Sequence, residues 1–386
     1  NHPEHIALVL PLSGQLAPVG TAIRDGFMAA YLESRRIFGT HIIMDIYDSR
    51  GEQEAAELAV QNANDRGVEF IIGPLAKEAV AAAITANQTQ KLPLYDAPPT
   101  NQAASVPTPS PSVIKPAAHM LTLNRAEESV LSPDNDETSV VPASTEPAEI
   151  YQFDLAPETE ATQAAERAAR QGLIRAMVMV PENIWGNRIY EAFTQEYQQL
   201  GGSVVALNRF KKGSADFSSG LKKQLNLDIS NARHKQLESF LAKDLGFTPR
   251  RRQDIDVIFV AGSPQEARLI KPQLKFFYAS NIPVYSTSSI YTGFSNAKRD
   301  KDLDNIVFCD MPWLLDNKPA PGSLHRTIQV SWPEQSAKYM RFYALGADAF
   351  RLLPQLEWLK NNNGDWIKGG TGKLSLTNNG VIQRQL

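Results

Sequence analysis

The chain has 386 residues, more than one compact core of ordinary size usually holds, which indicates two domains. Hydrophobic residues make up 42 % and charged residues 21 %, values typical of globular proteins rather than of disordered or membrane-embedded chains. The formal charge of −3 disfavours broad binding of nucleic acid, which needs clustered cations. No apolar run approaches the roughly 20 residues of a membrane-spanning helix.

The first hundred residues alternate between strand-like and helix-like segments. Apolar runs typical of buried strands occupy 6–10, 42–47, 70–72 and 92–95. Apolar side chains at helical spacing occupy 22–36, 54–66 and 77–89 between them. This alternation predicts a parallel sheet with helices on both faces, because each crossover between parallel strands uses one helix.

A change in composition then interrupts the pattern. Residues 97–148 are rich in Pro, Ser, Thr and Ala, and acidic residues are scattered through them. Such a segment buries too little apolar surface to offset the entropy lost on ordering. We therefore expect a flexible insertion, with one short helix near Ala117–Leu123.

Alternation resumes at residue 150 and predicts a second α/β unit. Strand-like runs occupy 150–153, 176–180, 203–207, 256–260 and 282–285, and helical patterns occupy 158–171, 187–200 and 265–279. A basic, mainly helical stretch covers 217–246. The tail adds a strand at 305–309, a helix over 334–360 that Gly346 and Pro354 divide or bend, and a strand at 373–376.

These elements predict two doubly wound parallel-sheet lobes that the chain joins by several crossovers. We expect lobe 1 to contain 1–149 and 287–360, with the insertion at 97–148, and lobe 2 to contain 150–286 and 361–386. The sequence begins with Asn1 rather than Met. We therefore expect it to be part of a longer protein whose targeting segment or lipid anchor lies outside it.

Motifs of catalysis and metal binding do not survive inspection of the sequence. No two of the six histidines lie at a metal-ligand spacing with Cys or Glu. The run at 369–373, GGTGK, lacks the earlier Gly of a phosphate loop, which would be Ile367, and its Ser or Thr, which is Leu374. Two Ser-x-x-Lys patterns have no Lys-Thr-Gly partner. We expect no enzyme, metal or cofactor, and a buried, unreactive Cys309.

Ligands of open parallel sheets bind beyond the carboxyl ends of the strands, so the residues at these ends are the candidates for a binding cleft. Small residues there let backbone amides approach a ligand, and Asp or Trp supply charge and stacking; the competing interpretation is that Gly and Pro only turn the chain. The candidates in the first unit are Ser13, Gly14, Asp48, Ser49, Gly73, Pro74, Leu75 and Asp96. Those in the second unit are Glu182, Asn183, Trp185, Gly262 and Ser263.

Two segments resemble type I periplasmic binding proteins: residues 6–27, IALVLPLSGQLAPVGTAIRDGF, and 178–202, VMVPENIWGNRIYEAFTQEYQQLGG. Three further segments resemble a narrower family, the outer-membrane lipoproteins that activate class A penicillin-binding proteins. They are RRRQDIDVIFVAGSPQEARLIKPQL, IPVYSTSSIY and DLDNIVFCDMPWLL. The resemblance covers nearly the whole chain except the insertion.

The resemblance implies a fold of two lobes joined by three crossovers, with a helical-repeat domain and a lipidated Cys outside this chain. It implies a non-catalytic regulator on the periplasmic face of the outer membrane of a Gram-negative bacterium. The implied partner is a class A penicillin-binding protein, a peptidoglycan synthase whose cross-linking activity the regulator stimulates. Membrane contact would come only through the lipid anchor, and nucleic acid is not a partner.

A different class of function, a receptor for a small solute between the lobes, remains open. Amino-acid receptors of this fold usually carry a Ser/Thr pair after the third strand, and residues 73–76 are Gly-Pro-Leu-Ala instead. A repressor would need a helix-turn-helix before residue 6, and none fits there. For an activator, the basic stretch Lys222–Arg252 and the insertion are the candidate contacts with the synthase.

Overall fold

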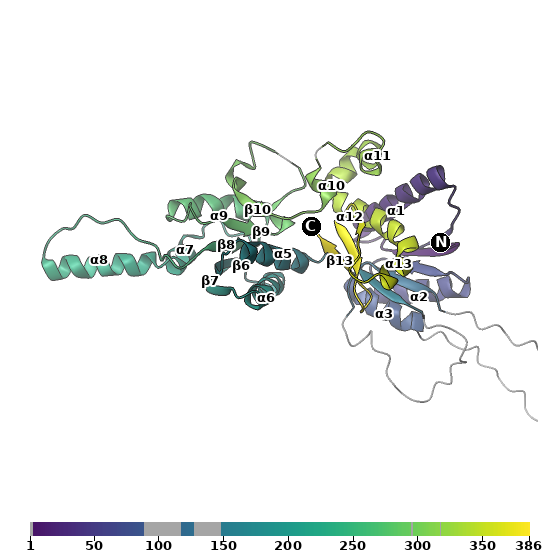
Figure 1. Cartoon of the computed structure of the whole chain (residues 1–386), viewed down its shortest axis with the longest axis horizontal. Coiled ribbons are helices and arrows are strands. Elements are labelled where there is room, and N and C mark those ends of the chain that lie inside the picture. Colours follow the sequence, from purple (N-terminus) through teal and green to yellow (C-terminus); the bar gives the residue numbers. More distant parts are fainter. Residues whose placement is uncertain (1–2, 89–116, 127–147, 295, 317) are drawn as a thin grey trace, which may run out of the picture. The chain divides into compact units, whose positions relative to one another are not determined.

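The computed structural model describes residues 3–88, 117–126, 148–294, 296–316 and 318–386 (Figure 1). The described chain divides into two compact units. Unit 1 contains 1–155 and 318–384, and unit 2 contains 156–317 together with 385–386. The chain therefore passes between the units three times, which confirms the prediction of several crossovers.

Unit 1 is built on an eight-stranded sheet of order β11-β12-β13-β5-β4-β3-β1-β2. The strands β1 (His5–Leu10), β2 (Ile43–Asp48), β3 (Phe70–Ile72), β4 (His119–Thr122), β5 (Ile150–Phe153) and β13 (Val381–Gln385) run parallel. At the far edge, β11 (Ile367–Lys368) pairs antiparallel with β12 (Lys373–Leu376), so the sheet is mixed.

Helices cover both faces of the unit 1 sheet. On one face, α2 (Gln53–Asp65) and α3 (Lys77–Gln88) bury their alanines and valines against β1, β3 and β4. The helices α1 (Ala17–Phe38) and α12 (Pro333–Leu352) pack closely against each other. After them come η3 (Leu353–Gln355) and α13 (Leu356–Asn361), and α11 (Leu324–Ser331) precedes α12.

Unit 2 contains a five-stranded, all-parallel sheet of order β10-β9-β8-β6-β7. Its strands are β6 (Arg175–Pro181), β7 (Ser203–Phe210), β8 (Val257–Val260), β9 (Val284–Ser286) and β10 (Ile306–Phe308). Alternate side chains of β6 point to opposite faces: Val178 packs against α5 (Pro157–Arg170) and α6 (Ile184–Gln199), and Met179 against α7 (Ser218–Gln224) and α9 (Pro264–Phe276). Both faces are therefore buried.

Three short elements follow β9, namely η1 (Ser288–Ile290), η2 (Lys301–Leu303) and, after β10, α10 (Pro312–Leu315). The remaining element of unit 2, α8 (Leu227–Leu241), extends away from the sheet (Figure 1). Only Leu227 of this helix is buried.

The predicted boundaries differ from these units in three segments. β5 and the tail 361–384 belong to unit 1, because β5 hydrogen-bonds β4 and β13 within the larger sheet. Residues 287–317 belong to unit 2, because β10 completes the smaller sheet beside β9. In both cases strand pairing, which connects residues far apart in the chain, decides the membership.

One element predicted within the insertion has the wrong type of secondary structure. Residues 119–122 form β4 rather than a helix, and Met120 and Leu121 are fully buried between β3 and β5. The predicted strand 92–95, and the remainder of the insertion apart from 117–126, lie outside the described residues. The prediction that this apolar segment is structured was thus correct, but the segment has the periodicity of a strand rather than of a helix.

Candidate functional site

The strand ends of unit 1 meet at one edge of its sheet, as predicted, and Asp48 joins them. Its Oδ1 accepts hydrogen bonds from the backbone N–H groups of Leu12 (2.8 Å), Ser13 (3.2 Å) and Arg50 (2.8 Å). Partial burial alone would raise the pKa of Asp48, but the hydrogen bonds from Ser13, Arg50 and Leu12 outweigh it and hold the pKa below its usual range. Asp48 therefore fixes the loops after β1 and β2.

The neighbouring candidates also have structural roles. A Cβ on Gly73 would lie 2.0 Å from the carbonyl oxygen of Val9, and Gly73 has a positive φ of 109°, so only glycine fits there. The carbonyl of Pro74 accepts from the Leu123 N–H (3.1 Å), and that of Leu75 accepts from the Asn124 side chain (3.0 Å). These contacts support the interpretation that these residues shape the chain.

Two other described candidates of unit 1 contribute less to this network. Gly14 has a positive φ of 75° and turns the loop after β1. The hydroxyl of Ser49 is buried and has no hydrogen-bond partner among the described residues. Asp96 lies outside the described residues.

The strand ends of unit 2 also converge, at the adjacent strands β6 and β8, and two of the candidates are helix caps. Asn183 accepts from the Gly186 N–H (2.7 Å) and begins α6. Ser263 begins α9 in a capping box with Glu266, whose Oε2 accepts from the backbone N–H (2.7 Å) and hydroxyl (2.9 Å) of Ser263. Gly262 packs beside this box.

The other two unit 2 candidates differ in burial. Trp185 is half-buried against the apolar layer of α5 and α6, whereas Glu182 is exposed and its backbone N–H donates to the Phe210 carbonyl (2.7 Å). The described candidates thus lie at the ends of the strands, and most of their polar groups serve the fold. Ligand binding by these candidates stays a prediction.

A buried carboxylate in unit 2 escaped the sequence analysis. Glu160 of α5 is only 6 % exposed, and its two oxygens accept from the backbone N–H (2.7 Å) and hydroxyl (2.9 Å) of Ser288. It thereby joins α5 to the chain that follows β9. The available signal was its place on the small-residue face of α5, beside Ala161 and Ala164.

Cys309 is half-buried rather than buried, which corrects the prediction made for it. Its Sγ lies 3.8 Å from the carbonyl oxygen of Glu160, at the end of the sheet's edge strand β10. An edge strand has no neighbour on one side, so the residue that follows it is less completely covered than an apolar run in the sequence suggests.

The feature that stands out for binding is the arm formed by α8 and its return segment 242–250. The return segment lies on one face of α8: the Leu245 carbonyl contacts His234 Nε2 (3.0 Å), the ring of Phe247 stacks on His234 with 4.0 Å between centroids, and the Arg250 N–H donates to Ser230 (3.1 Å). These contacts join α8 to the segment that directly follows it in the chain, so they hold the arm together outside the sheet.

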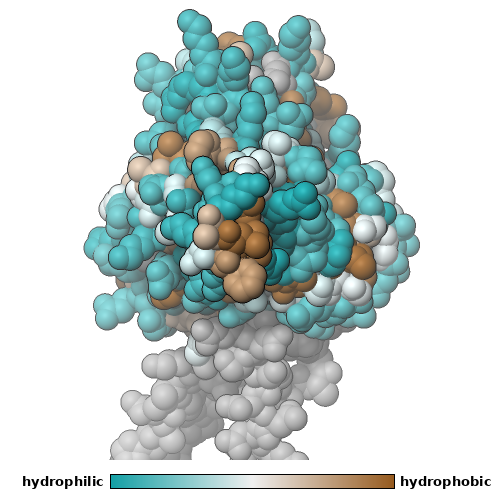
Figure 2. Space-filling view, turned by 90° about the vertical axis from the view of Figure 1, so that its left-hand side faces the viewer, coloured by the Kyte–Doolittle hydropathy of each residue, from teal (hydrophilic) through white to brown (hydrophobic). Residues whose placement is uncertain are grey.

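The arm leaves apolar side chains in solvent. Phe240 is 86 % exposed, and Leu237 and Leu241, which neighbour each other on the helix surface, are each about half exposed. Ile229, near the start of the helix, is also about half exposed. Viewed from the side of α8, apolar surface lies near the centre of the molecule, surrounded by hydrophilic side chains (Figure 2). Apolar side chains grouped on one exposed helix face are typical of interaction surfaces.

The basic helical stretch was predicted from the sequence, but its exposure was not. The same apolar spacing that places a helix face in a core here places it in water, and periodicity alone cannot separate the two. No described group of His, Cys, Asp and Glu side chains could hold a metal ion. Among the helices of the described chain, none is both long and apolar enough to cross a membrane.

Two α/β units with mainly parallel sheets, joined by three passages of the chain, define a type I periplasmic binding protein-like fold. The chain matches the family described as "LppC putative lipoprotein" over residues 1–107 and 132–386, and it belongs to that family. Among solved structures, it is similar to the LpoA C-domain from Haemophilus influenzae, described as a regulator of PBP1A, with a TM-score of 0.65, 21 % identity and coverage of 98 % of this chain and 95 % of the other.

Curated relatives that match the chain are named as penicillin-binding protein activators. The chain is 29 % identical over its whole length to the penicillin-binding protein activator LpoA of Vibrio cholerae, and 27 % identical over 99 % of its length to that of Photobacterium profundum. It spans 56 % and 55 % of these relatives, about half of their length. A structure from Chromobacterium violaceum described as "a putative branched-chain amino acid ABC transporter" shares the fold, with a TM-score of 0.61, 21 % identity and coverage of 99 % of this chain and 97 % of the other.

Proposed function

We propose that this chain is a non-catalytic regulator that binds a class A penicillin-binding protein in the periplasm and stimulates its cross-linking of peptidoglycan. The names of its relatives, activators in two genera and a regulator in a third, support this function. The full-length protein would be held at the periplasmic face of the outer membrane by a lipid anchor outside this chain. Membership in a lipoprotein family supports that location.

The exposed arm is the observation that carries the proposal, because it identifies particular residues for the contact with the synthase. A regulator without catalytic groups must act through a protein surface, and buried aromatic anchors supply most of the binding energy of such surfaces. Phe240 is the most exposed large apolar side chain described in this chain, and Leu237 lies one helical turn before it. We propose that these residues enter an apolar groove of the synthase.

Activation follows if the chain binds the cross-linking state of the synthase more tightly than its resting state. The preference is reciprocal: a substrate that favours the active state must also tighten binding of this chain by the same factor. A tenfold preference corresponds to about 1.4 kcal/mol, which one well-placed aromatic anchor can provide.

The test is binding and cross-linking with purified chain and purified class A synthase. We expect the Phe240→Asp variant to bind at least about tenfold more weakly than the unaltered chain, since it places a charge in the apolar contact. Phe276→Asp is the matched control, because Phe276 is 76 % exposed on α9, outside the arm.

The outcomes distinguish the proposed regulatory function from the proposed role of the arm as the contact surface. Equal losses of binding affinity in both variants, or no loss in either, would show that the arm is not the contact surface. No binding and no change of cross-linking rate by the unaltered chain would refute the function itself. Because both side chains are exposed, neither substitution should change the thermal unfolding of the chain, which circular dichroism can verify.

A further inference from the structure

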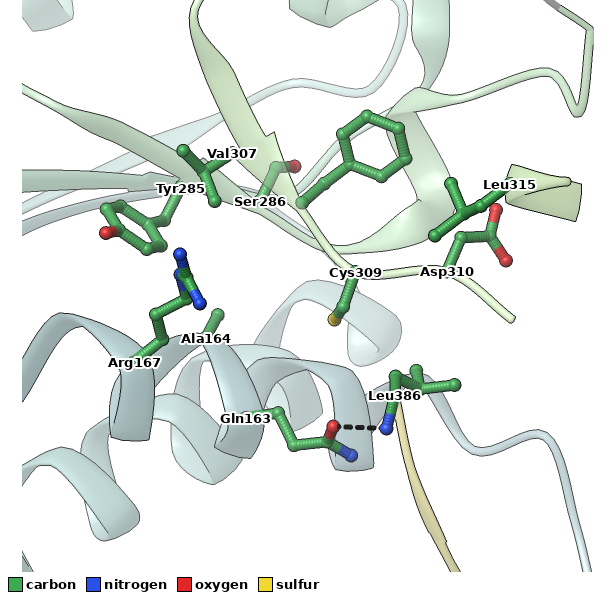
Figure 3. Close-up of a pocket in the computed structure, with 11 residues that line it drawn as sticks. Gln163, Ala164, Arg167, Tyr285, Ser286, Val307, Cys309, Asp310, Leu315 and Leu386 are labelled. Carbon is green, nitrogen blue, oxygen red and sulfur yellow. Dashed lines mark hydrogen bonds between the residues drawn. The ribbon is translucent and has the colours of Figure 1, made fainter. Parts of the chain in front are cut away.

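Unit 2 contains a cavity of about 300 Å³ that is separate from the arm. It lies between α5 and the last two strands of the sheet, β9 and β10 (Figure 3). Its lining includes Gln163, Ala164 and Arg167 from α5, Tyr285 from β9, Val307 from β10, and Cys309. The volume lies at the lower end of the range of small-molecule sites.

The walls of the cavity are mainly apolar. The hydroxyl of Tyr285 is already engaged by the side chain of Gln171 (2.6 Å), so Tyr285 offers its ring to the cavity. Val307 is 41 % exposed although it sits in a β-strand, and Leu315 is half exposed at the opposite end. The layer of α5 thus leaves apolar surface of the edge strand uncovered.

One cation lies on this apolar surface. Arg167 reaches from α5 toward Tyr285 and Val307 (Figure 3), and it has no ion-pair partner among the residues that the structure describes. Its neighbour Arg170 pairs with Glu166 (2.7 Å) and does not line the cavity. Both arginines occupy the last turn of α5, where the helix dipole favours cations, so the dipole does not explain why one of them faces the cavity.

The remaining polar groups make the two ends of the cavity electrostatically different. Asp310 lies at the end away from Arg167, and its carboxylate accepts from the Met311 N–H (2.8 Å). Gln163 accepts from the backbone N–H of Leu386 (2.8 Å), and the Ser286 hydroxyl donates to the Val260 carbonyl (2.5 Å). A ligand anion is therefore favoured at the Arg167 end and disfavoured at the Asp310 end.

We propose that this cavity binds a small amphipathic carboxylate. Its carboxylate would accept hydrogen bonds from the Arg167 guanidinium, and its apolar part would lie against Tyr285 and Val307 and extend toward Cys309. Two sources share this chemistry, a fatty acid and the carboxyl end of a short apolar peptide. The proposal is independent of the proposed function, because none of these residues belongs to the arm.

The only cysteine of the chain provides the measurement. The sulfur of Cys309 points into the cavity (Figure 3), so a bound ligand should slow its alkylation by neutral iodoacetamide. We expect decanoate, or a tetrapeptide ending in leucine, to slow the reaction several-fold in a saturable way. Decylamine and the amidated peptide match them in apolar surface but lack the anion, and we expect no protection from them.

Two variants test the role of the cation. Arg167→Gln should weaken the apparent affinity for the carboxylate by about tenfold or more, whereas Arg170→Gln should leave it unchanged. Protection by decanoate alone identifies a fatty acid, and protection by the peptide alone identifies a peptide end; either supports the site. No protection by any carboxylate, or equal protection by the amines or in the Arg167 variant, would overturn the proposal.

Discussion

Gly346 of α12 lies directly against the backbone of Ile23 in α1: a Cβ added to Gly346 would be 2.0 Å from the Ile23 carbonyl oxygen. The contact is reciprocal, because a Cβ on Gly26 of α1 would be 2.1 Å from the carbonyl oxygen of Tyr343. The two helices therefore touch through their backbones, at a distance that only glycine allows. This crossing holds the tail of the chain onto the first helix of unit 1.

We expect Gly346→Ala to lower the free energy of unfolding of unit 1 by about 3 kcal/mol, since the added methyl group must push two backbones apart. Gly246→Ala is the control, because nothing lies within 4 Å of a Cβ at Gly246. It should change stability by less than about 0.5 kcal/mol. Urea unfolding followed by circular dichroism measures both, and equal effects would show that the helices do not cross this tightly.

Gly346 also shows where sequence reasoning reaches its limit. The sequence predicted that Gly346 and Pro354 divide or bend the tail helix. Pro354 does so, since α12 ends at Leu352, but Gly346 lies within the helix and its role is packing against α1. The second break instead falls at Tyr339, whose φ is −121°. The sequence around a residue shows whether it breaks a helix, whereas a close approach depends on a partner that here is 323 residues away in the chain.

The same distinction separates the predicted parts of the fold from the others. The alternation of strands and helices is local, and it predicted two α/β units. The exposure of Phe240 and the burial of Glu160 contradict the ordinary preferences of Phe and Glu, because tertiary contacts decide both. The candidate cleft residues come from a rule about strand ends, and the rule says where they lie but not what they bind; Asp48 and Ser263 bind backbone there.

Removal of the Glu160 carboxylate should destabilise unit 2. Glu160→Ala leaves the buried backbone N–H of Ser288 without its acceptor, and we expect a loss of about 2 kcal/mol in urea unfolding. Glu166→Ala, on the same helix, removes only an exposed pair with Arg170 and should cost less than about 0.5 kcal/mol. A loss in Glu160→Ala no larger than that in the control would contradict the role assigned to this carboxylate.

Acid should weaken one ion pair of unit 2 in a defined window. Two hydrogen bonds of 2.6 Å from the Arg252 guanidinium lower the pKa of Asp254 to about 2. The unfolded chain has the ordinary value, near 3.8, so the ionised pair stabilises the fold above pH 4. That contribution decreases as the pH falls below about 4 and is lost as the pH passes through about 2.

The corresponding variant is Asp254→Asn. Because Asp254 is about half exposed, we expect this variant to lower stability by less than about 1 kcal/mol at pH 7 and by clearly less at pH 2, where half of the folded chains already carry the protonated carboxyl. Asp302→Asn, at an exposed position on η2, is the control and should change stability by less than about 0.5 kcal/mol at pH 7. A difference between wild type and Asp254→Asn that is as large at pH 2 as at pH 7 would exclude the ion pair as its cause.

The phosphate-loop-like run at 369–373 contacts a buried carboxylate of the chain itself. The buried carboxylate of Asp348 accepts from the backbone N–H of Gly370 (2.8 Å) and from the N–H (2.7 Å) and hydroxyl (2.6 Å) of Thr371. Lys373 lies over the ring of Trp366 at 4.6 Å. The glycines thus bring backbone donors to a carboxylate of the chain itself.

We therefore expect Asp348→Ala to cost at least about 3 kcal/mol, because it leaves three donors without their acceptor. Lys373→Ala should cost less than about 1 kcal/mol, the ordinary strength of an exposed cation–π contact. The order of the two effects in thermal unfolding is the decisive observation. A larger effect of Lys373→Ala than of Asp348→Ala would contradict the role assigned to the Asp348 carboxylate.

Excision of the arm should leave unit 2 folded. The ends of the arm already meet, since the Arg252 N–H donates to the Leu225 carbonyl (3.0 Å) and the Arg250 N–H to the Ser230 hydroxyl (3.1 Å). Replacing 231–249 by two glycines therefore closes the chain over a short distance and keeps the buried Leu227. Because the excised residues bury nothing in the sheet layers, we expect the unfolding temperature to fall by no more than a few degrees.

The same excised chain should no longer bind the class A synthase, whereas its cavity between α5 and β10 should remain. Alkylation of Cys309 in the presence and absence of decanoate then serves as an internal control for an intact unit 2. Full synthase binding after excision would place the contact elsewhere on the chain. Loss of binding together with a collapse in thermal stability would instead show that the arm supports the fold, contrary to the exposure of α8.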